Sequence, residues 1–158
     1  MVIVTLICAA LIVAADQITK LLVVNYIKPV GSVTVIPGIL DFSYVENTGM
    51  AFGWLENGRW LFIVFTTLVL LAMLVYIIYK RPASKLLNLT VGFVLGGGIG
   101  NLIDRVLNGF VVDFLALSFF PPVCNVADYF VTAGTVMFFV YLIFFSDWLK
   151  SDKVKKDG

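Results

Sequence analysis

Two aspartates near one short turn are the residues of this chain whose type and spacing could do chemistry. Asp113 interrupts an apolar stretch and Asp128 begins another, with Pro121 and Pro122 between them. A carboxylate next to hydrocarbon costs roughly 2.5–3.5 kcal/mol even on a lenient insertion scale, so its presence there indicates a function. Two carboxylates that converge can share one proton, and such a pair activates water without a metal or a nucleophilic side chain.

Each aspartate alone also has a purely structural interpretation. Asp113 can cap a turn or form a salt bridge at the membrane interface. Asp128 can cap a helix N-terminus, where the helix dipole favours an acid. The pair favours chemistry, because like charges at short distance cannot both ionise comfortably. One aspartate would act as a base on water, while its protonated partner polarises the carbonyl group under attack.

The elements that position these acids must be membrane helices. The chain has 158 residues, of which 61% are hydrophobic and 13% charged, and its mean hydropathy is +1.03. Soluble domains are nearer half apolar, with about a quarter of their residues charged. A net charge of +1 gives no support for a nucleic-acid partner. With no histidine and two distant cysteines, Cys8 and Cys124, we predict no metal, no cofactor and no disulfide.

Four apolar stretches are long enough to cross a hydrocarbon core of about 30 Å, which takes roughly twenty helical residues. They are residues 2–24, 60–79, 86–107 and 127–149. The first stretch lacks a basic leader and contains Asp16 and Lys20, so we expect a retained helix and not a cleaved signal peptide. The basic loop 80–85 and the basic tail 150–158 should be cytoplasmic, which puts both termini on that side.

The two remaining segments then lie outside the cytoplasm. Residues 30–36 are rich in β-branched side chains and residues 41–45 alternate polar with apolar, which predicts a small sheet on the membrane surface. A short interfacial helix is expected around residues 49–55, with Trp54 and Trp60 in an aromatic belt. Residues 110–115 predict another strand, followed by the Pro121–Pro122 turn. The predicted fold is a membrane all-α protein with four transmembrane helices, in a single domain of residues 1–158.

The third apolar stretch carries its own pattern. Small residues and one acid recur every four positions, at Gly92, Gly96, Gly100 and Asp104. Small residues at that spacing let another helix backbone approach closely. Asn101 and Arg105 are one turn apart, so both could offer donors to a peptide backbone. Alternatively, Arg105 neutralises Asp104.

Asp16 and Lys20 in the first stretch are also one turn apart. They could neutralise each other, Lys20 could extend to the outer surface, or the two could contact the acidic site. The segment 47–53 has small residues around Asn47, which by itself is a weak signal, because Asn and Gly make turns in many proteins.

Taken in order, these motifs resemble those of the lipoprotein signal peptidases, also called signal peptidase II. Five segments carry the resemblance: Asp-Gln-Ile-Thr-Lys at 16–20, Glu-Asn-Thr-Gly-Met-Ala-Phe-Gly at 46–53, Gly-Gly-Ile-Gly-Asn-Leu-Ile-Asp-Arg at 97–105, Val-Val-Asp-Phe at 111–114 and Asn-Val-Ala-Asp at 125–128. Each segment is modest alone, but the ordered set is specific and covers the whole chain. The chain departs from the family pattern at Cys124, where an aromatic residue is expected, and at Tyr129, where a small polar residue is expected.

The resemblance implies an aspartic endopeptidase of a bacterial inner or plasma membrane. Such an enzyme removes the signal peptide from prolipoproteins whose lipobox cysteine already bears diacylglyceryl, cutting just before that cysteine at the extracytoplasmic side. It implies that Asp113 and Asp128 are catalytic. It places Asn47, Gly49, Gly100, Asn101, Arg105 and Asn125 in the substrate pocket, and Asp16, Lys20 and Asp104 in its structural support. It also implies a β-cradle, a short mobile helix over the site and inhibition by globomycin. Nothing in the sequence demands a partner subunit, so we expect a monomer among membrane lipids.

Two other functions compete with this interpretation. A small proton-coupled transporter would use intramembrane acids, but it predicts internal repeats or broken helices, which the sequence lacks. An assembly factor could hold lipids or helices through the Gly92–Gly96–Gly100 face. That role gives no reason for both Asp113 and Asp128.

Overall fold

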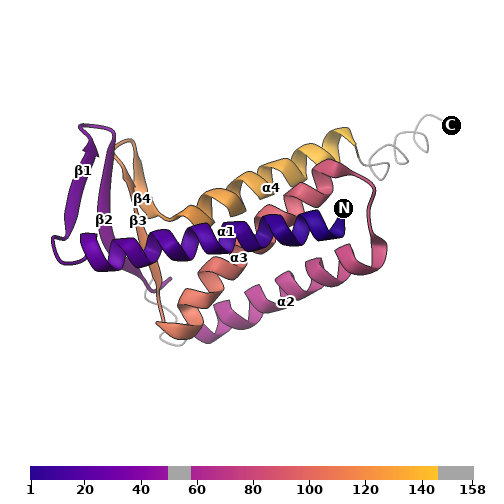
Figure 1. The fold of residues 1–158 in the computed structure, drawn as a ribbon, viewed down its shortest axis with the longest axis horizontal. Helices are drawn as coiled ribbons and strands as arrows, with labels where there is room; N and C mark the ends of the chain where they lie inside the picture. The colour runs from indigo at the N-terminus through magenta and orange to yellow at the C-terminus, as the bar shows by residue number, and fades with distance from the viewer. Residues whose placement is uncertain (50–57, 146–158) are drawn as a thin grey trace.

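The computed structural model describes residues 1–49 and 58–145, which form a helical bundle with a small sheet at one end (Figure 1). The helices are α1 (Val2–Leu22), continued by the π-helical turn η1 (Val23–Ile27), α2 (Gly58–Lys80), α3 (Lys85–Leu107) and α4 (Val126–Phe144). The strands are β1 (Ser32–Ile36), β2 (Leu40–Asn47), β3 (Val111–Leu117) and β4 (Phe120–Cys124).

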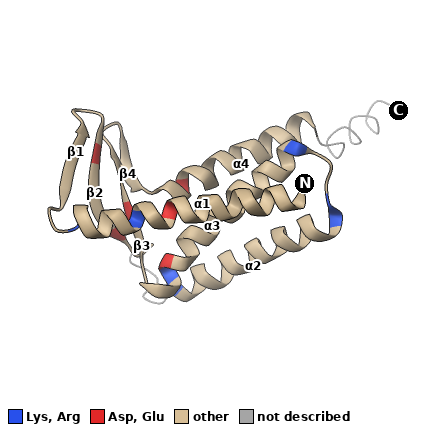
Figure 2. Cartoon of the chain, viewed as in Figure 1, with Lys and Arg blue, Asp and Glu red and all other residues tan. Residues whose placement is uncertain are grey.

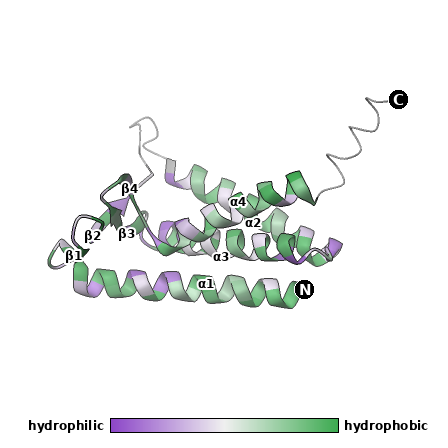
Figure 3. Ribbon diagram, turned by 90° about the horizontal axis from the view of Figure 1, so that it is seen from above, coloured by the Kyte–Doolittle hydropathy of each residue, from purple (hydrophilic) through white to green (hydrophobic). Residues whose placement is uncertain are grey.

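All four helices are long and apolar enough to cross a membrane, which confirms the four predicted spans. Most of their residues are hydrophobic (Figure 3). The observed bounds follow the predicted ones closely, except that α1 and η1 together reach Ile27. Residues 146–149 of the fourth predicted span, the basic tail and Trp54 lie outside the described residues. So does most of the predicted short helix around residues 49–55.

Helix α3 is the centre of the bundle and packs against α1, α2 and α4. Its most apolar stretch is 56% buried, against 11% for α2 and for α4, although its hydropathy is the lowest of the four. Its glycines explain this position. A Cβ at Gly96 would lie 2.7 Å from the Ile12 Cβ and 2.9 Å from the Ala9 carbonyl oxygen, so only glycine allows α1 to approach this closely.

The four strands form one antiparallel sheet in the order β1-β2-β3-β4. The predicted strands are confirmed, and β3 lies between β2 and β4. The predicted Pro121–Pro122 turn is wrong, because both prolines lie inside β4 and the chain reverses at Ser118–Phe119. Within the described part of the chain, strand β4 pairs only with β3, and proline, which has no N–H to donate, is tolerated on such an edge.

Charged residues lie mainly toward the two ends of the bundle (Figure 2). Acidic residues lie on and near the sheet, whereas Lys80, Arg81 and Lys85 lie at or beside the α2–α3 connection, at the opposite end. Trp60, near the start of α2, is 64% exposed at the sheet end, as a residue at a membrane interface would be.

Candidate active site

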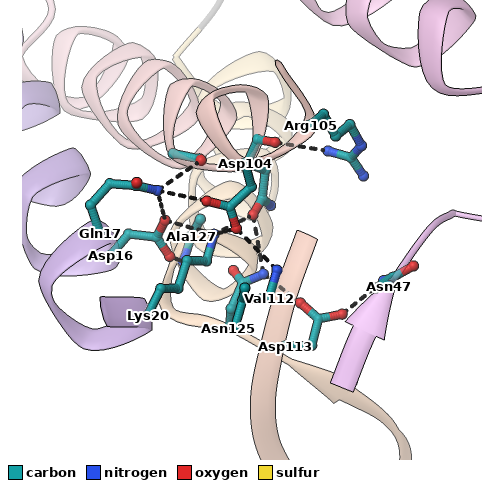
Figure 4. Close-up of polar contacts among 12 residues, drawn as sticks. Asp16, Gln17, Lys20, Asn47, Asp104, Arg105, Val112, Asp113, Asn125 and Ala127 are labelled. Carbon is teal, nitrogen blue, oxygen red and sulfur yellow. Dashed lines mark hydrogen bonds and ion pairs between the residues drawn. The ribbon is translucent and has the colours of Figure 1, made fainter. Parts of the chain in front are cut away.

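Asp113 is held in the buried part of β3, where its side chain is the one polar group among Val111, Val112 and Phe114. The residue is 1% exposed. Its Oδ2 accepts a hydrogen bond from Asn47 Nδ2 at 2.7 Å and its Oδ1 accepts one from Asn125 Nδ2 at 2.6 Å (Figure 4). The ion pairs among residues 1–49 and 58–145 join Lys20 to Asp16 and Asp104, and Lys28 to Glu46. Asp113 forms no salt bridge with any of these described residues, so its salt-bridge interpretation is wrong.

Asp128 lies in the first turn of α4 and forms a capping box with Asn125. Its Oδ2 accepts a hydrogen bond from the Asn125 backbone N–H at 3.1 Å, and the Asn125 Oδ1 accepts one from the Asp128 N–H at 2.9 Å. Asp128 therefore does cap the helix, as the structural interpretation predicted, but the capping hydrogen bond involves only one of its carboxylate oxygens. The other oxygen, Oδ1, accepts a hydrogen bond from Asn101 Nδ2 at 2.8 Å.

Asn125 links the two acids. This residue is fully buried, and its Nδ2 donates both to Asp113 Oδ1 and to Asn101 Oδ1, the latter at 3.1 Å. One residue from the start of α4 thus contacts the carboxylates of both Asp113 and Asp128. The structure brings together the two acids that the sequence analysis paired.

The surroundings of Asp113 favour its protonated form. Burial raises the pKa of the Asp113 carboxyl, and the negative charge of Asp128 raises it further. The hydrogen bonds from Asn47 and Asn125 and the charge of Lys20 act in the opposite direction without reversing the shift. A pair in which one acid keeps its proton can supply a general acid and a general base together.

Lys20 is the buried cation next to the two candidate acids, and it contacts two further carboxylates and Asn101. Its Nζ lies 2.8 Å from Asp16 Oδ2 and 3.0 Å from Asp104 Oδ2, and it donates a hydrogen bond to Asn101 Oδ1 at 3.0 Å. Lys20 is 3% exposed and Asp16 is fully buried, so Lys20 does not extend to the surface. The two remaining interpretations both hold, because Lys20 neutralises Asp16 and also contacts the acidic site through Asn101.

The carboxylates paired with Lys20 also fix the backbone next to the two candidate acids. Asp16 Oδ1 accepts a hydrogen bond from the Ala127 N–H at 2.9 Å, and Asp104 Oδ2 accepts one from the Val112 N–H at 3.0 Å (Figure 4). Ala127 and Val112 immediately precede Asp128 and Asp113. Each supporting acid therefore anchors the peptide that leads into one member of the pair.

Arg105 does not neutralise Asp104, so that alternative is wrong. Asp104 is occupied by Lys20, while Arg105 Nη1 makes a long 3.4 Å hydrogen bond to the Asn101 carbonyl oxygen. The guanidinium lies over the Phe62 ring, 5.5 Å from its centroid. Among residues 1–49 and 58–145, Nη1 is the guanidinium nitrogen of Arg105 that makes a hydrogen bond.

The two predicted pocket glycines have different surroundings. Gly49 has a φ of +76°, and its N–H donates to Asn47 Oδ1 at 2.8 Å, which orients the Asn47 amide toward Asp113. A Cβ at Gly100 would lie 2.6 Å from Asp16 Oδ2. Gly100 thus makes room for the buried Asp16 carboxylate.

The sequence analysis missed Gln17 and Arg59. Gln17 Nε2 donates to Asp104 Oδ1 at 3.0 Å, to the Gly100 carbonyl at 3.1 Å and to Asp16 Oδ2 at 3.3 Å. Arg59 donates from Nε and Nη2 to the carbonyls of Arg105 and Val106, at 2.9 and 2.8 Å, and so caps the end of α3. A polar residue between Asp16 and Lys20 in an apolar span was the available signal for Gln17.

The two departures from the family pattern lie at the edge of the site. Cys124 is a half-buried free thiol in β4. Burial raises the pKa of this thiol, and the negative charges of Asp128 and Asp113 raise it further. The thiol therefore lies close enough to both acids to be affected by their charges. Tyr129 follows Asp128 and is 44% exposed. Among the described residues, no group of three His, Cys, Asp or Glu side chains could hold a metal ion.

Comparisons with known proteins agree on one family. Residues 8–144 match the family model described as Signal peptidase (SPase) II. The lipoprotein signal peptidase of Caldanaerobacter subterraneus subsp. tengcongensis is 45% identical over 88% of this chain and 95% of its own length. That of Symbiobacterium thermophilum is 39% identical over 88% and 93%. A bacterial membrane enzyme solved in meso at 1.9 Å resolution superposes with a TM-score of 0.84 at 29% identity, over 90% of this chain and 94% of that one.

Proposed function

This chain belongs to the signal peptidase II family, and from that membership and the linked acids we propose that it is an aspartic endopeptidase of diacylglyceryl-modified prolipoproteins. It cleaves just before the lipidated cysteine. The observation that carries the proposal is the contact of Asn125 with both Asp113 and Asp128. Membership of the family argues against the transporter and assembly-factor alternatives.

In the proposed mechanism, a water molecule lies between the two acids. Asp128, as the carboxylate, takes a proton from this water, whose oxygen adds to the carbonyl carbon of the scissile peptide bond. Asp113 carries the shared proton, as its raised pKa favours, and donates it to the carbonyl oxygen. Asp128 then protonates the leaving amine as the C–N bond breaks, and the proton on the carbonyl-derived hydroxyl returns to Asp113. Cleavage therefore needs no metal and no covalent intermediate.

The proposed pocket residues surround this pair. Asn101 and Asn125 fix the two carboxylates, Asn47 holds Asp113, and Gly49 holds Asn47. Arg105 offers guanidinium N–H donors to the substrate backbone. We also propose that globomycin-type inhibitors bind in this pocket. All the residues of the site come from one chain, so a monomer is sufficient.

We also propose how the molecule lies in the membrane. The acids and the sheet are at one end of the bundle and the basic α2–α3 connection is at the other (Figure 2). The positive-inside rule puts that connection, and with it both termini, in the cytoplasm of a bacterial cell. The site then lies at the extracytoplasmic surface of the inner or plasma membrane, where the lipidated cysteine of a precursor also lies.

A gel-shift assay tests the activity. The purified protein in lipid or detergent is mixed with a precursor peptide that carries a diacylated cysteine, and with the same peptide bearing an unmodified cysteine. We expect a shortened product from the diacylated peptide and little from the unmodified one. A folded protein that leaves the diacylated peptide intact would contradict the proposal.

The pH dependence of cleavage should report on Asp113. Because Asp113 must keep its proton, kcat/KM should fall as the pH rises through its raised pKa. The Asn47 hydrogen bond stabilises the ionised carboxylate and lowers that pKa. Asn47→Ala should therefore move the alkaline limb of the pH–rate profile to higher pH, whatever it does to the maximal rate.

The control is Asn25→Ala at an exposed position in η1, which should leave the alkaline limb in place. An alkaline limb that stays or moves to lower pH in Asn47→Ala would contradict this assignment.

A further inference from the structure

An apolar cleft lies between α2 and α4. It has a volume of about 650 Å³, and its walls come from α2, α3 and α4. Within the described ranges 58–80 and 126–144, α2 and α4 scarcely touch, whereas each packs against α3. The lining residues that matter here are Ala72, Thr90, Val94, Thr135 and Leu142. No charged residue lines the cleft among those described.

The α3 wall of this cleft continues along the helix into the acidic site. Val94 stands seven residues before Asn101, and Thr90 stands eleven before it. These offsets are close to two and three helical turns, so all three residues share one face of α3. Asn101 on that face donates its hydrogen bond to Asp128.

The α4 wall leads to the same place. Thr135 and Leu142 stand seven and fourteen residues after Asp128, again close to whole turns. Both walls of the cleft are therefore direct continuations of the helix faces that carry Asp128 and its partner Asn101.

A second apolar cavity, of about 540 Å³, lies between α1 and α2 but ends elsewhere. Its α3 wall contains Leu95 and Leu102, and the next residue on that face, Val106, is 51% exposed. The hydrogen bonds of Gln17 to Gly100 and of Arg59 to Val106 tie α1 and α2 to α3 near that end. This cavity offers a control of similar size and chemistry.

We propose that the α2–α4 cleft binds the apolar helical segment of the signal peptide that precedes the cleaved bond. The proposal rests on the proposed function. A peptide in hydrocarbon must satisfy its own backbone and so enters as a helix. At a rise of about 1.5 Å per residue, Thr135 and Leu142 lie about 10 and 21 Å along α4 from Asp128. The substrate residues in contact with the cleft are then about seven to fourteen positions before the cleaved bond.

Filling the cleft tests the proposal. Ala72→Trp places a large side chain in the α2–α4 cleft, and Ala10→Trp makes the same change in the α1–α2 cavity. Each variant is given two diacylated precursors, one with its full apolar segment and one with about five residues before the cleaved bond. We expect Ala72→Trp to raise KM for the full precursor by about tenfold or more, which corresponds to about 1.4 kcal/mol of lost binding. The short precursor should be cleaved by Ala72→Trp as by the unchanged protein, and Ala10→Trp should alter neither reaction.

The outcomes separate this inference from the proposed function. Cleavage of both precursors by the unchanged protein with no effect of Ala72→Trp on the full one would overturn the cleft assignment and leave the peptidase intact. An equal effect of Ala10→Trp, or an equal loss on the short precursor, would also overturn it, because the change would then act through the bundle or its lipid. Failure of the unchanged protein to cleave either precursor would overturn both proposals.

Discussion

Asp113→Asn and Asp128→Asn are each expected to lower kcat for a diacylated precursor by about 10²–10⁴-fold, the usual contribution of a general acid or base. An asparagine at either position can neither take the proton from water nor return one to the leaving group. The substrate pocket and the bundle remain, so the precursor should still bind. The gel-shift assay gives the rate, and retention of the labelled precursor on the immobilised variant gives binding.

The two variants differ in their structural side effects. Asp128→Asn would keep an oxygen for the Asn125 N–H, but it would turn an amide toward Asn101 Nδ2 and remove the negative charge from the first turn of α4, so a loss of about 1 kcal/mol is expected. Asp41→Asn is the matched control, because Asp41 lies in β2 of the same sheet and pairs with Thr34 and Ala116, away from the acid pair. If either acid variant cleaves the precursor at the full rate, and Asp41→Asn does so as well, the aspartic mechanism is contradicted.

The helices and most of the strands were predictable because each depends on a local pattern. The run Leu86–Leu107 is apolar for long enough to cross a membrane, and Val111–Phe114 is a short apolar strand bounded by turn residues. The error at Pro121–Pro122 arose because proline is frequent both in turns and on sheet edges. Only the pairing of β4 with β3 alone separates these two environments.

The acids of the site were predictable in type but not in their partners. Asp113 and Asp128 were detectable because an unexplained carboxylate near hydrocarbon is rare. The contact of Lys20 with Asp104 depends on how α1 rotates against α3, and the role of Asn125 depends on where α4 begins relative to β3. Neither relation is encoded in the spacing of residues within one helix. Gln17 was missed for the same reason, since its partners lie on α3.

The supporting charges connect the stability of the bundle to the geometry of the site. Lys20 pairs with both Asp16 and Asp104, and these carboxylates hold the peptides that precede Asp128 and Asp113. The position of each member of the acid pair therefore depends on one buried cation.

Lys20→Met is expected to destabilise the fold more than a substitution of either member of the acid pair. It leaves Asp16 and Asp104 as buried carboxylates without their cation, and breaking a buried ion pair in this way costs about 3–5 kcal/mol. For a chain of this size that corresponds to a fall in Tm of about 10 °C. Thermal unfolding in detergent measures the change, and cleavage of the diacylated precursor should be lost with it.

A triple variant shows whether the uncompensated charges cause the loss. In Asp16→Asn/Lys20→Met/Asp104→Asn no charge is left without a partner, and each asparagine oxygen can still accept from Ala127 or Val112. Replacing a whole buried ion cluster is often close to neutral, so most of the lost Tm should return. Lys28→Met, which breaks the exposed pair with Glu46, should change Tm far less. If Lys20→Met unfolds at the same temperature as the unchanged protein, the buried cluster does not support the acid pair as inferred.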